Sequence, residues 1–114
     1  MVRAAEIPDS ATGRRRYLIT EHGDVLSQNL ADGSFRCLSR KKGSRHPWVK
    51  IGGRWQSVQK LFVASFFAKE FERFSPTGYK VYACDGCPEH VSVRNVAVLF
   101  YLPAGYRVIR EETA

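Results

Sequence analysis

A single change of hydrophobic period divides this chain and determines its fold class. Up to about residue 56, short apolar segments alternate with polar residues and are separated by turn-forming glycine, asparagine and aspartate. From Val58 onward, the apolar residues recur at helical spacing as far as Phe66, and Ser57 is a suitable N-cap. Strands that precede one long helix are typical of the α+β class. The sequence therefore predicts an α+β fold in which an N-terminal antiparallel β-sheet packs on a helix.

The length of 114 residues suits one hydrophobic core, so we expect a single domain over 1–114. The glycine pair at 52–53 predicts a hairpin between strands at 48–51 and 54–57. The expected order is a flexible basic lead-in at 1–16, a β-sheet region at 17–56, a helix at 57–74, a strand at 79–83, a turn at 84–88, a short helix at 92–98 and a last strand at 106–109.

The net positive charge of the chain comes entirely from residues 1–60. The whole chain has 18 lysines and arginines against 11 acidic residues, a net charge of +7. Residues 1–60 contain twelve basic and five acidic side chains, whereas the remainder contains six of each. Such an asymmetry favours a polyanionic partner, of which nucleic acid is the commonest. The alternative is a basic protein that has no such partner.

Cysteine usage and hydropathy indicate the compartment. The three cysteines, Cys37, Cys84 and Cys87, do not form the even-numbered framework of a secreted disulfide protein. No apolar run approaches the length of a membrane span, and residues 1–16 lack the apolar core of a secretory signal. We therefore expect a cytoplasmic protein, in the cytoplasm of a bacterial host if the chain is encoded by a phage.

Three segments, in the same order, resemble the HNH homing endonucleases of phages and group I introns. They are YLITEHGDVLS from Tyr17, WVKIGGRWQSVQKLFVASFF from Trp48 and YKVYACDGCPEHVSVRNV from Tyr79, and together they span residues 17–96. The resemblance implies a ββα-metal nuclease region at 79–100. In that family, a histidine on the first strand activates water, and a divalent metal stabilises the charge that develops on the phosphate.

The resemblance is incomplete at the positions where the family carries its catalytic residues. The family's Asn-His pair falls on Tyr82 and Ala83, and alanine cannot accept a proton. Asp85-Gly86 matches the family's turn, and Asn95 matches its helix asparagine. The family's amide pair falls on His90 and Val91, and its earlier helix histidine is replaced by Gln59. The resemblance thus implies a nuclease region without its catalytic histidine, and the sequence assigns no catalytic residue.

Two alternatives keep chemistry at this region. His90 could act as a displaced base, with Asp85 and Asn95 on a metal. Alternatively, Cys84, Cys87 and His90 have C-x-x-C-x-x-H spacing, which is typical of a zinc site. A fourth ligand would have to come from Cys37, His22 or His46; otherwise the thiols are simply free and packed. We expect no cofactor unless zinc is bound there.

The basic residues of the first half suggest a nucleic-acid surface. Strand alternation places Trp48 and Lys50 on one face and Val49 and Ile51 on the other, towards the helix. Arginine side chains on a three-stranded sheet can read base edges in the major groove, while residues on a flexible arm contact phosphates. Alternatively, the tryptophans belong to the core and the charges form a solvated face. The candidate nucleic-acid-binding residues are Arg14, Arg15, Arg16, Arg40, Lys41, Lys42, Arg45, Trp48, Lys50 and Arg54.

These observations favour a nuclease-inactive HNH-like protein that binds double-stranded DNA and regulates or occludes a site in a phage or mobile element. A second hypothesis is a phage effector that inhibits a host nucleic-acid enzyme. It arises because Phe67, Phe71 and Phe74 place aromatic rings on the far side of the helix, where a partner protein or a second copy in a homodimer would cover them. A third hypothesis is a divergent, active metal-dependent HNH nuclease. No membrane partner is expected.

Overall fold

A computed structural model describes residues 2–8, 11, 13–102 and 105–110. It is mixed α/β and consists mostly of strands, in three antiparallel sheets. In chain order the elements are β1 (Ala4–Glu6), β2 (Arg15–Thr20), β3 (Val25–Asn29), β4 (Phe35–Cys37), β5 (Trp48–Ile51), β6 (Arg54–Ser57), α1 (Val58–Phe66), α2 (Ala68–Phe74), the 3₁₀ helix η1 (Ser75–Thr77), β7 (Tyr79–Ala83), β8 (Val96–Leu102) and β9 (Gly105–Arg110).

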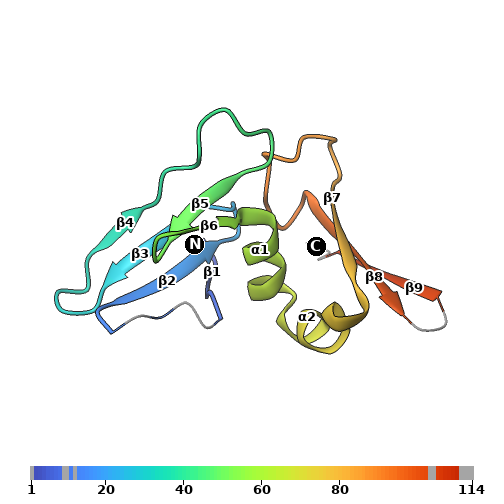
Figure 1. The fold of residues 1–114 in the computed structure, drawn as a ribbon, viewed down its shortest axis with the longest axis horizontal. Coiled ribbons are helices and arrows are strands. Elements are labelled where there is room, and N and C mark those ends of the chain that lie inside the picture. Colours follow the sequence, from blue (N-terminus) through green and yellow to red (C-terminus); the bar gives the residue numbers. More distant parts are fainter. Residues whose placement is uncertain (1, 9–10, 12, 103–104, 111–114) are drawn as a thin grey trace.

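The helices lie between two sheets (Figure 1). Strands β1 to β4 form a four-stranded sheet in sequential order, β5 and β6 form a separate hairpin, and β7 to β9 form a three-stranded sheet. One core cluster joins all of these parts. It contains Ile19 of β2, Phe62 of α1 and Phe100 of β8, each fully buried. The α+β class and the N-terminal sheet beside a helix are therefore confirmed.

The expected single helix at 57–74 is wrong, because the helix breaks at Phe67. Ser57 is the N-cap, as predicted, and its side chain accepts a hydrogen bond from the Lys60 amide. At Phe67 the backbone leaves helical geometry (φ −116°, ψ 41°) and places this ring in the core. The bend also brings Phe71 against Tyr79 and Phe74 against Phe100. Packing within the chain thus accounts for the aromatic rings that suggested a partner surface.

The expected helix at 92–98 is also wrong, and with it the ββα order expected over 79–100. Residues 96–102 form strand β8, which pairs along its length with β7 and β9. Val96, Val98 and Phe100 are buried at alternate positions, and this period of two belongs to a strand. Only the segment just before Val96 is a turn. The region is therefore a strand, a loop and a strand.

The described residues of the lead-in at 1–16 do not form a flexible arm. Residues 4–6 form β1, which pairs with β2, and Arg15 and Arg16 belong to β2 itself. Ile7 is buried in the core, and its amide donates to the Tyr17 carbonyl. This apolar anchor fixes the segment to the sheet. Residues 1, 9, 10 and 12 of the lead-in lie outside the described part of the chain.

Candidate functional site

The β5–β6 hairpin presents one apolar and one basic-aromatic face. Its turn is Gly52-Gly53, with positive φ at both residues, and the register pairs Lys50 with Trp55. On β5, Val49 and Ile51 are buried and Lys50 is exposed, as predicted, whereas Trp48, predicted on the same face as Lys50, is half-buried. On β6, Trp55 is exposed. Arg54 pairs with Ile51, so it belongs to the inner side of the ribbon and is exposed only because it lies at the tip.

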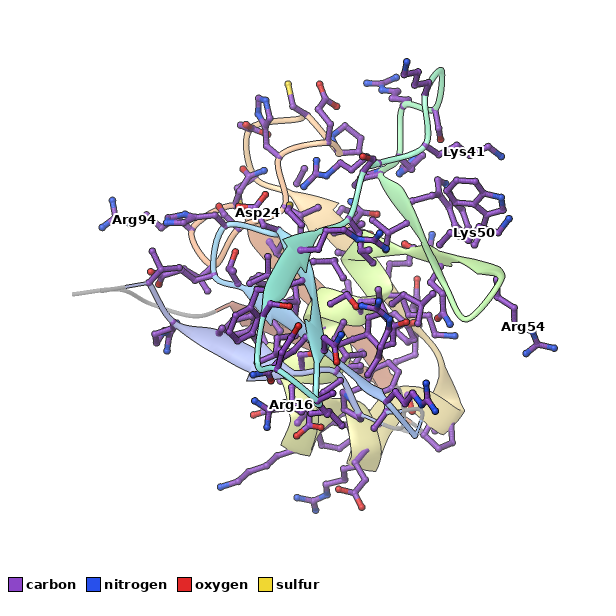
Figure 2. All side chains as sticks on the ribbon, turned by 90° about the vertical axis from the view of Figure 1, so that its left-hand side faces the viewer. Arg16, Asp24, Lys41, Lys50, Arg54 and Arg94 are labelled. Atoms are coloured by element: carbon purple, nitrogen blue, oxygen red, sulfur yellow. The ribbon has the colours of Figure 1, made fainter. Side chains whose placement is uncertain are left out.

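Trp55 is the centre of this outer face. Its side chain is 46% exposed, and the Nζ atoms of Lys41 and Lys50 lie 5.4 and 5.8 Å from its ring centroid. Such distances are typical of cation–π contacts. The Lys41 amide donates to the Trp48 carbonyl, which holds the preceding loop beside β5. We call Lys41, Lys50 and Trp55, together with Arg54 at the tip of the hairpin, the hairpin surface; the side chains of its three cations point to the same side, away from Arg94 (Figure 2).

The other predicted basic residues differ in what they contact. Lys42 and Arg45 are exposed on the loop that leads to β5. Arg40 is half-buried, and its guanidinium donates to the carbonyls of Glu89 (2.7 Å) and Gly23 (3.2 Å). Arg40 therefore joins two turns of the fold.

Arg15 and Arg16 lie on strand β2 of the four-stranded sheet, and Arg14 is in the turn before it. Arg14 is exposed. The Arg15 guanidinium donates to the hydroxyl of Ser27, which is buried on β3. Arg16 lies opposite Gln28, and its Nε atom and the Gln28 Oε1 atom are buried without a hydrogen-bond partner. Because Arg15 and Arg16 belong to strand β2, they do not lie on the flexible arm that the sequence suggested.

Asn95 braces the loop between β7 and β8. Its Oδ1 accepts from the Asp85 amide at 2.9 Å, and its Nδ2 donates to Asp85 Oδ1 at 3.0 Å and to the His90 carbonyl. The Asn95 carbonyl accepts from the Cys84 amide. Both ends of the Asn95 amide are thus engaged within the loop.

The structure brings Asp85, Cys87 and His90 together. The Nδ1 atom of His90 lies 2.7 Å from Asp85 Oδ2, while Asp85 Oδ1 accepts from the Cys87 amide. The hydrogen bond from His90 lowers the pKa of Asp85, and the same bond raises the pKa of His90. One ligand atom from each of the three residues lies within 4.8 Å of the others; Asp85 and His90 are exposed and Cys87 is half-buried.

This group differs in one member from the predicted zinc ligand set of Cys84, Cys87 and His90. Cys84 is exposed at the end of β7 and does not belong to the group, whereas Asp85 does. Within the described part of the chain, Cys37, His22 and His46 do not join it either.

The residues at the positions where the resembling family carries its active-site groups lie in different environments. Tyr82 is exposed on β7, Ala83 is half-buried and Val91 is buried in the core. Gln59 on α1 donates to the Pro88 carbonyl at 3.5 Å, so the helix contacts the loop where the resemblance would place a histidine.

Sequence reasoning left Trp55 out of the binding set. The signal was present, because a two-glycine turn closing on Ile51 and Arg54 places Trp55 opposite Lys50. In contrast, the presence of Asp85 in place of Cys84 in the group could not be predicted from residue spacing, because it depends on the hydrogen bonds of Asn95 across the loop.

No protein family matches the chain, and neither the curated proteins nor the solved structures contain a significant match to it. The likeness to HNH endonucleases rests on the three sequence segments, and strand β8 departs from it. None of the helices formed by the described residues has the length and apolar character that crossing a membrane requires.

Proposed function

We propose that this protein binds double-stranded DNA through the hairpin surface, without cutting it, and so regulates or occludes the bound site. The observation that carries the proposal is the exposed Trp55 on a two-stranded ribbon, with the ammonium groups of Lys41 and Lys50 at 5.4 and 5.8 Å from its ring centroid. A major groove about 12 Å wide admits such a ribbon.

The chemistry of the hairpin surface suits a duplex. Lysine and arginine at the edges of the ribbon can contact phosphates and release their counterions, which supplies affinity. The indole can contact base edges and thymine methyl groups, which supplies preference among sequences. Lys42 and Arg45, exposed on the adjacent loop, extend the cationic area beyond the ribbon.

Two features support binding without hydrolysis. Ala83, at the position where the resembling family carries its base, has no group that accepts a proton from water. Asn95, which would hold a catalytic metal in that family, uses its amide to brace the loop. The protein therefore lacks a general base at that position.

Fluorescence anisotropy with a labelled duplex tests the proposal. Between about 50 and 200 mM salt, replacing one phosphate-contacting cation should reduce the slope of log affinity against log salt by about 0.9. We expect Lys50→Gln to do so, while Arg94→Gln, on the opposite side in Figure 2, leaves the slope unchanged. Equal effects of the two substitutions would refute the hairpin surface.

Trp55→Ala should weaken duplex binding by about fivefold or more, because an aromatic contact with bases contributes on the order of 1 kcal/mol. Phe35→Ala removes another exposed aromatic ring, on β4, and should leave the affinity unchanged. Stronger binding of the matching single strand would overturn the choice of duplex. Metal-dependent nicking of a plasmid by purified protein would overturn the absence of cleavage.

A further inference from the structure

We propose that Asp85, Cys87 and His90 form a binding site for Zn²⁺ that closes the loop between β7 and β8. The proposal does not depend on DNA binding, because it concerns a different loop and a different chemistry. It rests on three unlike ligand atoms, a carboxylate oxygen, a thiol sulfur and an imidazole nitrogen, that converge within 4.8 Å.

The spacing of the ligand atoms is close to what zinc requires. Zinc bonds of about 2.0–2.3 Å in a tetrahedral arrangement place ligand atoms roughly 3.4–3.6 Å apart. The gap between His90 Nδ1 and Asp85 Oδ2 must widen from 2.7 Å, and the wider gaps of the group must shorten from at most 4.8 Å. All three side chains lie at least partly in solvent, so small torsional changes achieve both. Three protein ligands leave the fourth position for water.

The carboxylate is already oriented for a metal. Asp85 Oδ1 accepts from the Cys87 amide and from Asn95, so it fixes the direction of the carboxylate. The other oxygen, Oδ2, contacts His90 Nδ1. Zinc would take the place of the proton between Oδ2 and Nδ1. Asp85 Oδ1 would keep its hydrogen bonds from the Cys87 amide and Asn95, which orient the carboxylate towards the metal.

The identity of the ligands selects the metal. A thiolate favours zinc over magnesium or calcium, which prefer oxygen ligands. The loop that carries the group is also anchored from outside, because Arg40 donates to the Glu89 carbonyl and Gln59 to the Pro88 carbonyl. A metal would therefore bind to a segment whose middle, between Cys87 and His90, is already positioned, which reduces the entropy lost on binding.

Cobalt titration of the full, reduced chain tests the site. A thiolate ligand to Co²⁺ gives an ultraviolet charge-transfer band, and added Zn²⁺ should abolish it. Cys87→Ser should remove this band and weaken zinc binding at least tenfold in competition with a chromophoric chelator. Cys84→Ser is the matched control, since it removes an exposed thiol three residues away, and it should keep the band.

His90→Gln should also weaken zinc binding, and circular dichroism of each variant verifies that the fold is intact. The proposal is overturned if the native protein gives no band at saturating cobalt, if Cys84→Ser removes the band as fully as Cys87→Ser, or if magnesium displaces zinc. Anisotropy measurements in chelator keep this test separate from that of DNA binding.

Discussion

Replacing Gly23 with alanine should be among the most damaging single-methyl changes in this protein. Gly23 lies in the turn between β2 and β3 with φ +81°, and it is buried. A Cβ atom added there would lie 2.2 Å from the carbonyl oxygen of Val91 and 3.0 Å from the Val91 Cβ. Both are parts of a residue that is itself buried in the core, so the neighbour cannot move aside freely.

The cost has two components. Left-handed backbone geometry costs an alanine about 1–2 kcal/mol. A carbon atom contacts a carbonyl oxygen at about 3.3 Å, so the Val91 backbone must shift by roughly 1 Å. Forcing an extra methyl group into a packed interior costs about 1–3 kcal/mol. The sum is about 2–5 kcal/mol, which is a large share of the stability of a domain.

Gly33→Ala separates the two components. Gly33 has φ +75° and no atom within 4 Å of the added Cβ, so this variant has the backbone cost alone. The change in unfolded-state entropy is the same in both variants and cancels. Urea unfolding should therefore place Gly23→Ala about 1–3 kcal/mol below Gly33→Ala in free energy of unfolding. A difference under about 0.5 kcal/mol would show that the turn does not pack tightly on Val91.

Three further predictions concern the core, the helix and the loop. Phe62→Ala empties a fully buried position and should lower the free energy of unfolding by about 3–5 kcal/mol, whereas Phe35→Ala at an exposed position should change it by under about 0.5 kcal/mol; urea titrations compare the two. Ser57→Ala removes the N-cap bond of α1 and should cost about 1 kcal/mol in the same assay, with Ser57→Asp close to the native value. In metal-free buffer, the interaction between Asp85 and His90 should stabilise the fold most between pH 3.8 and 6.5. The pKa of Asp85 is lowered in the folded protein, so the stability that this carboxylate contributes is lost as the pH falls below 3.8 and through its folded pKa. The pKa of His90 is raised in the folded protein, so the stability that the imidazolium contributes is lost as the pH rises above 6.5 and through its folded pKa. Unfolding of the native protein and of Asp85→Asn across this range checks it, and parallel curves would contradict the hydrogen bond.

Local sequence signals predicted much of the first half of the fold. The Gly52-Gly53 turn and the alternation from Trp48 to Ile51 led directly to the hairpin and its buried face. Ser57 identified the start of α1. These signals succeed because a turn, a cap and a strand face depend on neighbouring residues alone.

The errors arose where distant residues decide the structure. The break at Phe67 depends on rings that pack against the C-terminal sheet, so helical spacing alone extended the helix to residue 74. Strand β8 has a short apolar run that reads equally well as a helix, and its pairing with two other strands decides the outcome. Ile7 fixes the lead-in through burial, although its flanking residues resemble a loop.

The candidate site was predicted in part for the same reason. The residue types Asp85, His90 and Asn95 were recognised from their order, and the structure brings them into one loop. Which cysteine joins them depends on how the loop turns after Asp85, and this is set by the hydrogen bonds from Asn95.

The bridge from Arg40 has a consequence for the order in which the chain can complete its fold as it leaves the ribosome. The residue whose carbonyl Arg40 contacts is made 49 positions later, and the Val93 amide donates back to Glu21 in the same way. Until that later segment emerges, the turn between β2 and β3 in the nascent chain lacks these contacts, and the core residues of the first sheet are exposed to water. Translation pauses before the codons for residues 88–93 should therefore prolong the time in which this half is vulnerable to protease and to association with other nascent chains.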